Sequence, residues 1–236
     1  MSPKSANSTP ITMREQTFLR FTLGQRLEHA ILMLGGLVLL LTGLPQKYRE
    51  LSISQDLLST PERVFLIRQI HHIAAIVLGL VVLYHLGRII YLMARRKLPG
   101  DLLPTGQDVR DAWQMLQYLL FLRKDKPTFG RYNFEQKVTY WFVFFGIAIM
   151  GISGLIIWFP VVVTQFLPGG VVPAAKLTHS TESVVMAIFI VIWHIYHVHI
   201  ERLNLSMFTG RLSEEEMRTF HEKEYKRLAG HSGGRK

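Results

Sequence analysis

Four long runs of apolar residues, separated by polar connections, dominate the pattern of the chain. They cover residues 27–44, 64–93, 138–159 and 176–200, with boundaries good to a few residues. About twenty mostly apolar helical residues span the roughly 30 Å hydrocarbon core of a bilayer, and each run is close to that length or exceeds it. The pattern therefore predicts an all-α membrane protein, a bundle of four transmembrane helices.

The polar segments predict further elements. The longest connection, residues 94–136, contains DVRDAWQMLQYLLFL, which predicts an amphipathic helix over about residues 107–122. That helix either lies in the membrane surface or offers a surface to a soluble partner subunit. Residues 203–236 predict a solvated helix followed by a disordered end. Residues 1–16 lack the apolar core and cleavage site of a signal peptide, so the first span is expected to act as the insertion signal.

Charge assigns an orientation to these segments. The 236-residue chain has 27 Lys and Arg against 17 Asp and Glu, a formal net charge of +10. These basic residues border the apolar runs, which argues against nucleic-acid binding and fits the positive-inside rule. The rule places an N-terminal segment (residues 1–25), the 94–136 connection and a tail (residues 203–236) in the cytoplasm. Both termini of the membrane domain, residues 26–202, are then expected on the cytoplasmic side.

The chain contains no cysteine. Within this chain that excludes structural disulfides, cysteine-ligated zinc, iron–sulfur clusters and thioether-attached haem. Any haem is therefore expected to be held by histidine and without a covalent link.

The fourth run, KLTHSTESVVMAIFIVIWHIYHVHI, has a histidine near each end, His179 and His194. In an α-helix the fifteen-residue step between them is roughly 22 Å of rise and a rotation of about 60°. Two imidazoles at two depths on one face suit a helix that provides axial ligands to two stacked haems. Alternatively, the histidines pack, form hydrogen bonds or relay protons, since ionisable groups inside a membrane have several uses.

The second run provides partners at matching depths. His71 and His85 are fourteen residues apart, about 21 Å of rise, and project within about 40° of each other, whereas His72 and His85 are about 140° apart. His72 is then expected to support a site or lie at the interface. With the predicted topology, His71 and His179 form an outer pair, and equal depth pairs His85 with His194 near the inner face.

Other polar residues near the inner and outer ends extend these sites. His29 and His197 are left for a quinone, a haem propionate or another haem. Arginines flank the predicted ligands and suit propionates, or else extend to the membrane surface as arginines commonly do; they are Arg26, Arg68, Arg88 and Arg202. Glu28 and Glu182 either carry protons for quinone chemistry or pair with an arginine. A zinc site at His194, His197 and His199 is disfavoured because their spacing separates the first ring from the third.

These residues resemble a known family, the membrane cytochrome b (gamma) subunits of respiratory formate dehydrogenase and nickel–iron hydrogenase, within the wider cytochrome b group. The resemblance covers nearly the whole chain. RQIHHIAA, with His71 in the ligand position, matches the second helix, and His29 matches the first. The fourth helix matches at His179 and at the HIY that begins with His194. The segment GRYNFEQKVTYWFVFFGIAIMGISGLIIWFP matches the entry to the third, at Gly130, Tyr132, Asn133, Gln136, Lys137, Trp141, Gly154 and Pro160.

The resemblance implies a di-haem b-type cytochrome with an outer haem between His71 and His179 and an inner haem between His29 and His194. His29 and His85 are thus rivals for the inner haem, and a third haem using His197 is a further alternative. The resemblance also implies a prokaryotic cytoplasmic (inner) membrane and a larger respiratory complex. There, electrons pass in either direction between an iron–sulfur or multihaem partner subunit and menaquinone or ubiquinone. A proton-coupled transporter or a non-redox membrane anchor is the alternative function.

Overall fold

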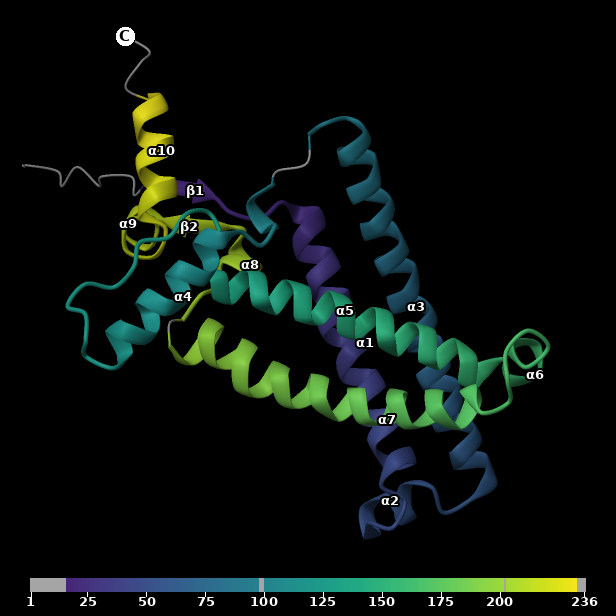
Figure 1. The fold of residues 1–236 in the computed structure, drawn as a ribbon. Helices are drawn as coiled ribbons and strands as arrows, with labels where there is room; N and C mark the ends of the chain where they lie inside the picture. The colour runs from purple at the N-terminus through teal and green to yellow at the C-terminus, as the bar shows by residue number, and fades with distance from the viewer. Residues whose placement is uncertain (1–15, 98–99, 202, 233–236) are drawn as a thin grey trace, which may run out of the picture.

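Four long helices form the body of the protein (Figure 1). The computed structural model describes residues 16–97, 100–201 and 203–232. The long helices are α1 (Leu23–Lys47), α3 (Pro61–Ala94), α5 (Phe134–Trp158) and α7 (Val171–Phe189), and α7 continues without a break as the π-helix η2 (Ile190–Ile200). By length and composition each of the four can cross a membrane. The all-α membrane fold is confirmed, and every helix begins a few residues before its predicted span.

Polar caps define where these helices begin. Thr22 caps α1 in a capping box with Gln25, and Asn133 caps α5 in the same way with Gln136. Thr60 caps α3, and Pro61 occupies its first turn, where a missing N–H costs nothing. The caps satisfy backbone N–H groups that the apolar runs alone would leave unpaired, so each helix extends into the preceding polar segment.

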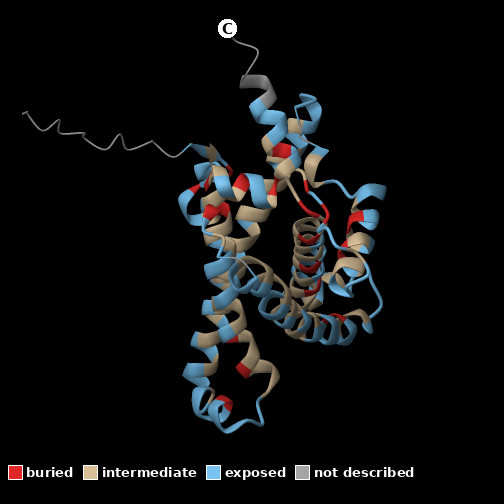
Figure 2. Cartoon of the chain, turned by 90° about the vertical axis from the view of Figure 1, so that its left-hand side faces the viewer, coloured by how far each residue is buried: buried red, intermediate tan, exposed pale blue. Residues whose placement is uncertain are grey.

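The long helices pair as two hairpins. α1 packs along α3, and α5 packs along α7, while α1 also touches α7. The two hairpins cross at a wide angle rather than running parallel (Figure 1). The helices keep apolar surface on the outside, with Leu80 62% and Leu83 65% exposed, and Figure 2 shows exposed residues along them. In a membrane protein such surface faces lipid.

Short elements lie in the connections between the long helices. α2 (Ser52–Leu57) lies between α1 and α3, and α6 (Pro160–Val163) follows α5. The long connection holds the 3₁₀ helix η1 (Gly100–Leu102) and α4 (Gly106–Leu119). Lys137 on α5 forms an ion pair with Asp108 of α4 at 2.9 Å, and Trp141 donates a hydrogen bond to the Leu102 carbonyl. α4 is therefore fixed to the start of α5, while its Trp113 is 60% exposed.

The sequence predicted a solvated helix in the tail, but the structure shows several short elements there. The tail contains α8 (Ser206–Thr209), β2 (Arg211–Ser213), α9 (Glu214–Phe220) and α10 (Glu222–Ser232). β2 pairs antiparallel with β1 (Thr17–Leu19), so Thr17 faces Ser213. Leu212, Met217 and His221 are buried, and His221 donates to the Gly130 carbonyl, so the tail packs against the long connection.

Several predictions fall on residues outside the described part of the chain. The polar start of the N-terminal segment, residues 1–15, is among them. So are the last residues of the tail, 233–236, where a disordered end is expected, and Arg202.

Candidate functional site

His71 on α3 and His179 on α7 face each other with ring centroids 6.3 Å apart. The Nδ1 atom of His71 lies 2.9 Å from the Thr42 hydroxyl, which itself donates to the Val38 carbonyl at 2.7 Å. Because the hydroxyl has only one proton to give, His71 Nδ1 must be the donor in this contact. The Nε2 atom of His71 is therefore left with a lone pair.

His179 is held in the same tautomer. Its Nδ1 lies 3.1 Å from the Met150 carbonyl, which can only accept, and 3.2 Å from the Ser153 hydroxyl. Ser153 donates its own proton to the Ile149 carbonyl at 2.7 Å. Nδ1 of His179 therefore carries the hydrogen, and Nε2 is free to bind a metal. A histidine ligand is commonly oriented in this way by a hydrogen bond on its other nitrogen.

Glycines let neighbouring helices approach these two rings. A Cβ atom at Gly43 of α1 would lie 3.4 Å from Cε1 of His71, and one at Gly154 of α5 would lie 3.2 Å from Cε1 of His179. The second distance is shorter than ordinary van der Waals contact, so α5 needs glycine there for the ring to keep its place. Each ring is thus held by a hydroxyl and a glycine from the adjacent helix of its hairpin.

A second facing pair lies toward the other end of the helices. His29 of α1 and His194 of η2 have ring centroids 6.2 Å apart. Neither ring has a hydrogen-bond partner among the described residues, so the nitrogens of both remain available. His194 lies in the π-helical stretch, a rare geometry that occurs often at functional sites.

The two pairs fit a haem iron bound between imidazoles. An iron held by two imidazole nitrogens at about 2 Å each separates the ring centroids by roughly 6 Å. The measured separations of 6.2 and 6.3 Å match this value. Neutral imidazole is a haem ligand, and the chain provides no cysteine to compete with it.

His85 is not opposite His194, in contrast to the pairing predicted from equal depth. Its Nδ1 donates to Glu28 Oε2 at 2.6 Å, and its Nε2 lies 3.2 Å from the Tyr140 hydroxyl. Both ring nitrogens are engaged, so His85 has no lone pair to offer a metal in this arrangement. Matching depth along two axes is not enough, because the ring must also point toward its partner.

The other predicted histidines have different surroundings. His72 stacks on Trp158 with centroids 4.0 Å apart, consistent with an interfacial or supporting position. His194, His197 and His199 do not form a cluster. Instead His197 Nδ1 lies 2.8 Å from Glu201 and 3.8 Å from Glu135, while His199 is exposed.

The arginines expected near haem propionates differ from one another. Arg88 lies 3.8 Å from Glu28, and its Nε atom is buried with no hydrogen-bond partner in the described residues, so it can still bind a carboxylate. Arg68 is exposed on α3, one turn before His71. Arg26 hydrogen-bonds to the Met207 and Phe208 carbonyls of α8 instead of facing a cofactor position.

Residues that sequence reasoning missed have a recognisable signal. Thr42, Ser153 and Tyr140 are polar groups within long apolar runs, and each contacts one of the histidines discussed above. A hydroxyl at membrane depth needs a partner, so such positions mark candidate contacts. Glu135 and Glu201, which both contact His197, were missed because they lie at helix ends, where charged residues are common.

A comparison with known protein families gives a match over most of the chain. The model of the family described as prokaryotic cytochrome b561 matches residues 20–210, most of the 236-residue chain. The matched region contains both facing histidine pairs. No curated protein matches the chain at a significant level.

Proposed function

Because the chain belongs to the prokaryotic cytochrome b561 family, and is therefore a multi-pass membrane protein that transfers electrons through b-type haem, we propose that it holds two haems. The outer haem lies between His71 and His179, and the inner haem lies between His29 and His194. The two facing pairs, with centroid separations of 6.3 and 6.2 Å, carry this proposal.

The chemistry divides between the haem and the chain. When bound, haem supplies a one-electron couple whose potential depends on its ligands, their hydrogen bonds and burial. The chain supplies neutral imidazole nitrogens. Thr42 fixes the His71 tautomer, and Ser153 with the Met150 carbonyl fixes that of His179.

We further propose that the haems pass electrons between a partner redox subunit at the outer face and quinone near the inner pair. The family includes cytochrome b subunits of nickel–iron hydrogenase-type complexes, which supports a partner in a membrane redox complex. The cytoplasmic membrane is the proposed location, and electrons flow in either direction according to the potentials of the partner and the quinone.

The inner end of the helices offers hydrogen-bonding groups for a quinone head group. Glu28, His85 and Tyr140 form a connected chain there, with Arg88 beside Glu28. Glu28 Oε1 and Arg88 Nε are buried without a hydrogen-bond partner among the described residues. Buried polar atoms left without partners are costly, so their presence supports a polar ligand at this place. The transporter and anchor alternatives lose support, since the family shows a b-type cytochrome.

Haem quantification on purified variants tests the proposal. The protein in mild detergent should contain about two haems b per polypeptide, measured by pyridine haemochrome against protein mass. His29→Ala and His71→Ala should each lose one haem, because each removes one axial ligand. His85→Ala should retain both haems, because its ring does not face an inner-pair imidazole. Loss of a haem in His85→Ala with full occupancy in His29→Ala would contradict the inner pair.

A further inference from the structure

Three potential ligand side chains converge where α5 begins and η2 ends, apart from the facing histidine pairs. They are Glu135 in the first turn of α5, His197 in η2 and Glu201 directly after it. One ligand atom from each lies within 4.8 Å of the others. His197 Nδ1 is 2.8 Å from Glu201 Oε2 and 3.8 Å from Glu135 Oε2.

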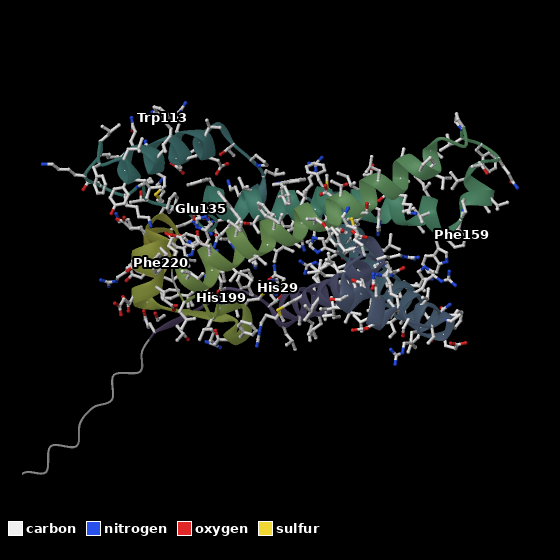
Figure 3. All side chains as sticks on the ribbon, turned by 90° about the horizontal axis from the view of Figure 1, so that it is seen from below. His29, Trp113, Glu135, Phe159, His199 and Phe220 are labelled. Carbon is white, nitrogen blue, oxygen red and sulfur yellow. The ribbon has the colours of Figure 1, made fainter. Side chains whose placement is uncertain are left out.

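The charge and access of this cluster favour a cation. The side chains of Glu135, His197 and Glu201 are 11%, 22% and 32% exposed, so two carboxylates meet in a partly desolvated place. Lys126 binds Oε1 of Glu201 at 3.3 Å and leaves Oε2 directed at His197. Glu135, Glu201 and Phe220 of the tail line one pocket, and Figure 3 shows Glu135 and Phe220 at the same end of the molecule.

We propose that Glu135, His197 and Glu201 bind a divalent transition-metal ion of the Zn²⁺ class. One nitrogen and two carboxylate oxygens are suitable donors for Zn²⁺ and for neighbouring first-row ions. Ligands at about 2.0–2.1 Å around a tetrahedral ion lie roughly 3.3 Å from one another, and the observed 2.8 and 3.8 Å bracket that spacing. Three protein ligands would leave a fourth position for water on a tetrahedral ion.

Binding requires one proton to move. His197 Nδ1 donates to Glu201 in the metal-free arrangement, and it must present a lone pair to the ion. A neutral ring does so by releasing the Nδ1 proton to solvent and taking up one proton from solvent at Nε2, so the ring stays neutral and the number of bound protons does not change. The competing arrangement is a protonated His197 bridging two carboxylates as an ion pair, and it needs no metal.

Zinc binding to the haem-loaded protein separates these arrangements. The protein, purified through a tag without histidine, is dialysed to equilibrium against buffered Zn²⁺, and zinc per polypeptide is measured by mass spectrometry. One zinc should bind per chain. Glu135→Gln, His197→Ala and Glu201→Gln should each weaken binding by at least about tenfold, as loss of a ligand exceeds loss of a supporting contact.

Two controls share the surroundings of the cluster without supplying a ligand. Glu222→Gln alters a carboxylate that lines the same pocket, and His199→Ala alters a nearby exposed histidine, so both should bind zinc as the parent does. Lys126→Ala removes a competing cation and should tighten binding, a gain that a misfolded variant would not give. Absence of saturable zinc, or unchanged binding in all three cluster variants, would overturn the proposal.

Discussion

At the scale of single residues, the partners of each ring nitrogen distinguish histidines that look alike in the sequence. His71 and His179 each donate from Nδ1 and keep Nε2 free, whereas His85 uses both nitrogens in contacts with Glu28 and Tyr140. A metal ligand needs a lone pair directed at the ion, so these contacts decide more than depth in the membrane does.

Thr42→Val tests the hydrogen bond that orients His71. Valine keeps the shape of threonine but cannot accept from Nδ1, so the imidazole becomes a weaker electron donor to iron. The potential of the outer haem should rise, by at most roughly 60 mV if one neutral hydrogen bond is lost from a one-electron couple. A spectroscopic redox titration follows both haems in one experiment and gives a potential for each.

Thr164→Val is the control for this substitution. Thr164 likewise bonds back to a carbonyl one turn earlier, that of Pro160, but it is exposed and has no histidine contact in the described residues. Its potentials should equal those of the parent. A shift confined to the inner haem in Thr42→Val would contradict the assignment of His71 to the outer one.

At the scale of the helices, regular geometry decided which sites could be predicted from the sequence. His71 and His179, which the sequence pairs as outer ligands, lie in regular α-helix, and their rings face each other with centroids 6.3 Å apart. His194 lies in η2, where π-helical turns replace the α-helical rotation assumed for the fifteen-residue step. His85 also meets a buried carboxylate on α1 that no spacing rule reveals. The proposal of His29 over His85 as the inner ligand therefore rests on contacts that the sequence does not reveal.

Asp108→Asn tests how α4 is attached to α5. Burial raises the pKa of Asp108, but hydrogen bonds from Lys137 and Thr105 together lower it by more than burial raises it. The pKa of Asp108 therefore lies below its usual range. A depressed carboxyl pKa stabilises the folded state above the unfolded value of about 4, and the contribution is lost as pH falls through the folded value. The substitution should weaken docking by about 1–2 kcal/mol at neutral pH.

Hydrogen exchange of the amides in α4 measures this effect. Exchange in Asp108→Asn should be roughly tenfold faster at neutral pH, and the difference from the parent should vanish in acid below the folded pKa, after correction for intrinsic rates. Asp125→Asn, at an exposed position of the same connection, should exchange like the parent. A difference that persists undiminished in acid would show that the charge of Asp108 is not its source.

At the scale of the whole molecule, the sequence predicted the spans but not the structure that joins the two ends of the chain. Long apolar runs identify four membrane helices because the bilayer demands such length. The three-residue strands β1 and β2 are too short for a period-two pattern, and nearly 200 residues separate them. Similarly, His221 is buried and donates from Nδ1 to the Gly130 carbonyl, a distant contact that only the folded chain reveals.

The pairing of β1 with β2 has a consequence for topology. Residues 17–19 and 211–213 must lie on the same side of the membrane to form the ladder, and Arg26 reinforces it by bonding to carbonyls of α8. The basic 94–136 connection lies at the same end, because His221 of the tail donates to its Gly130 carbonyl at 2.9 Å. From the positive-inside rule we expect this side to face the cytoplasm.

Reporter fusions test both steps of that inference. Green fluorescent protein, which fluoresces when it stays in the cytoplasm, should be bright at either terminus, and alkaline phosphatase, which is active only outside, should be inactive there. A phosphatase fusion in the connection between α1 and α3 should be active. Two inactive fluorescent fusions would invert the orientation but retain the strand pairing, whereas one bright and one dark terminus would place β1 and β2 on opposite sides and exclude the ladder.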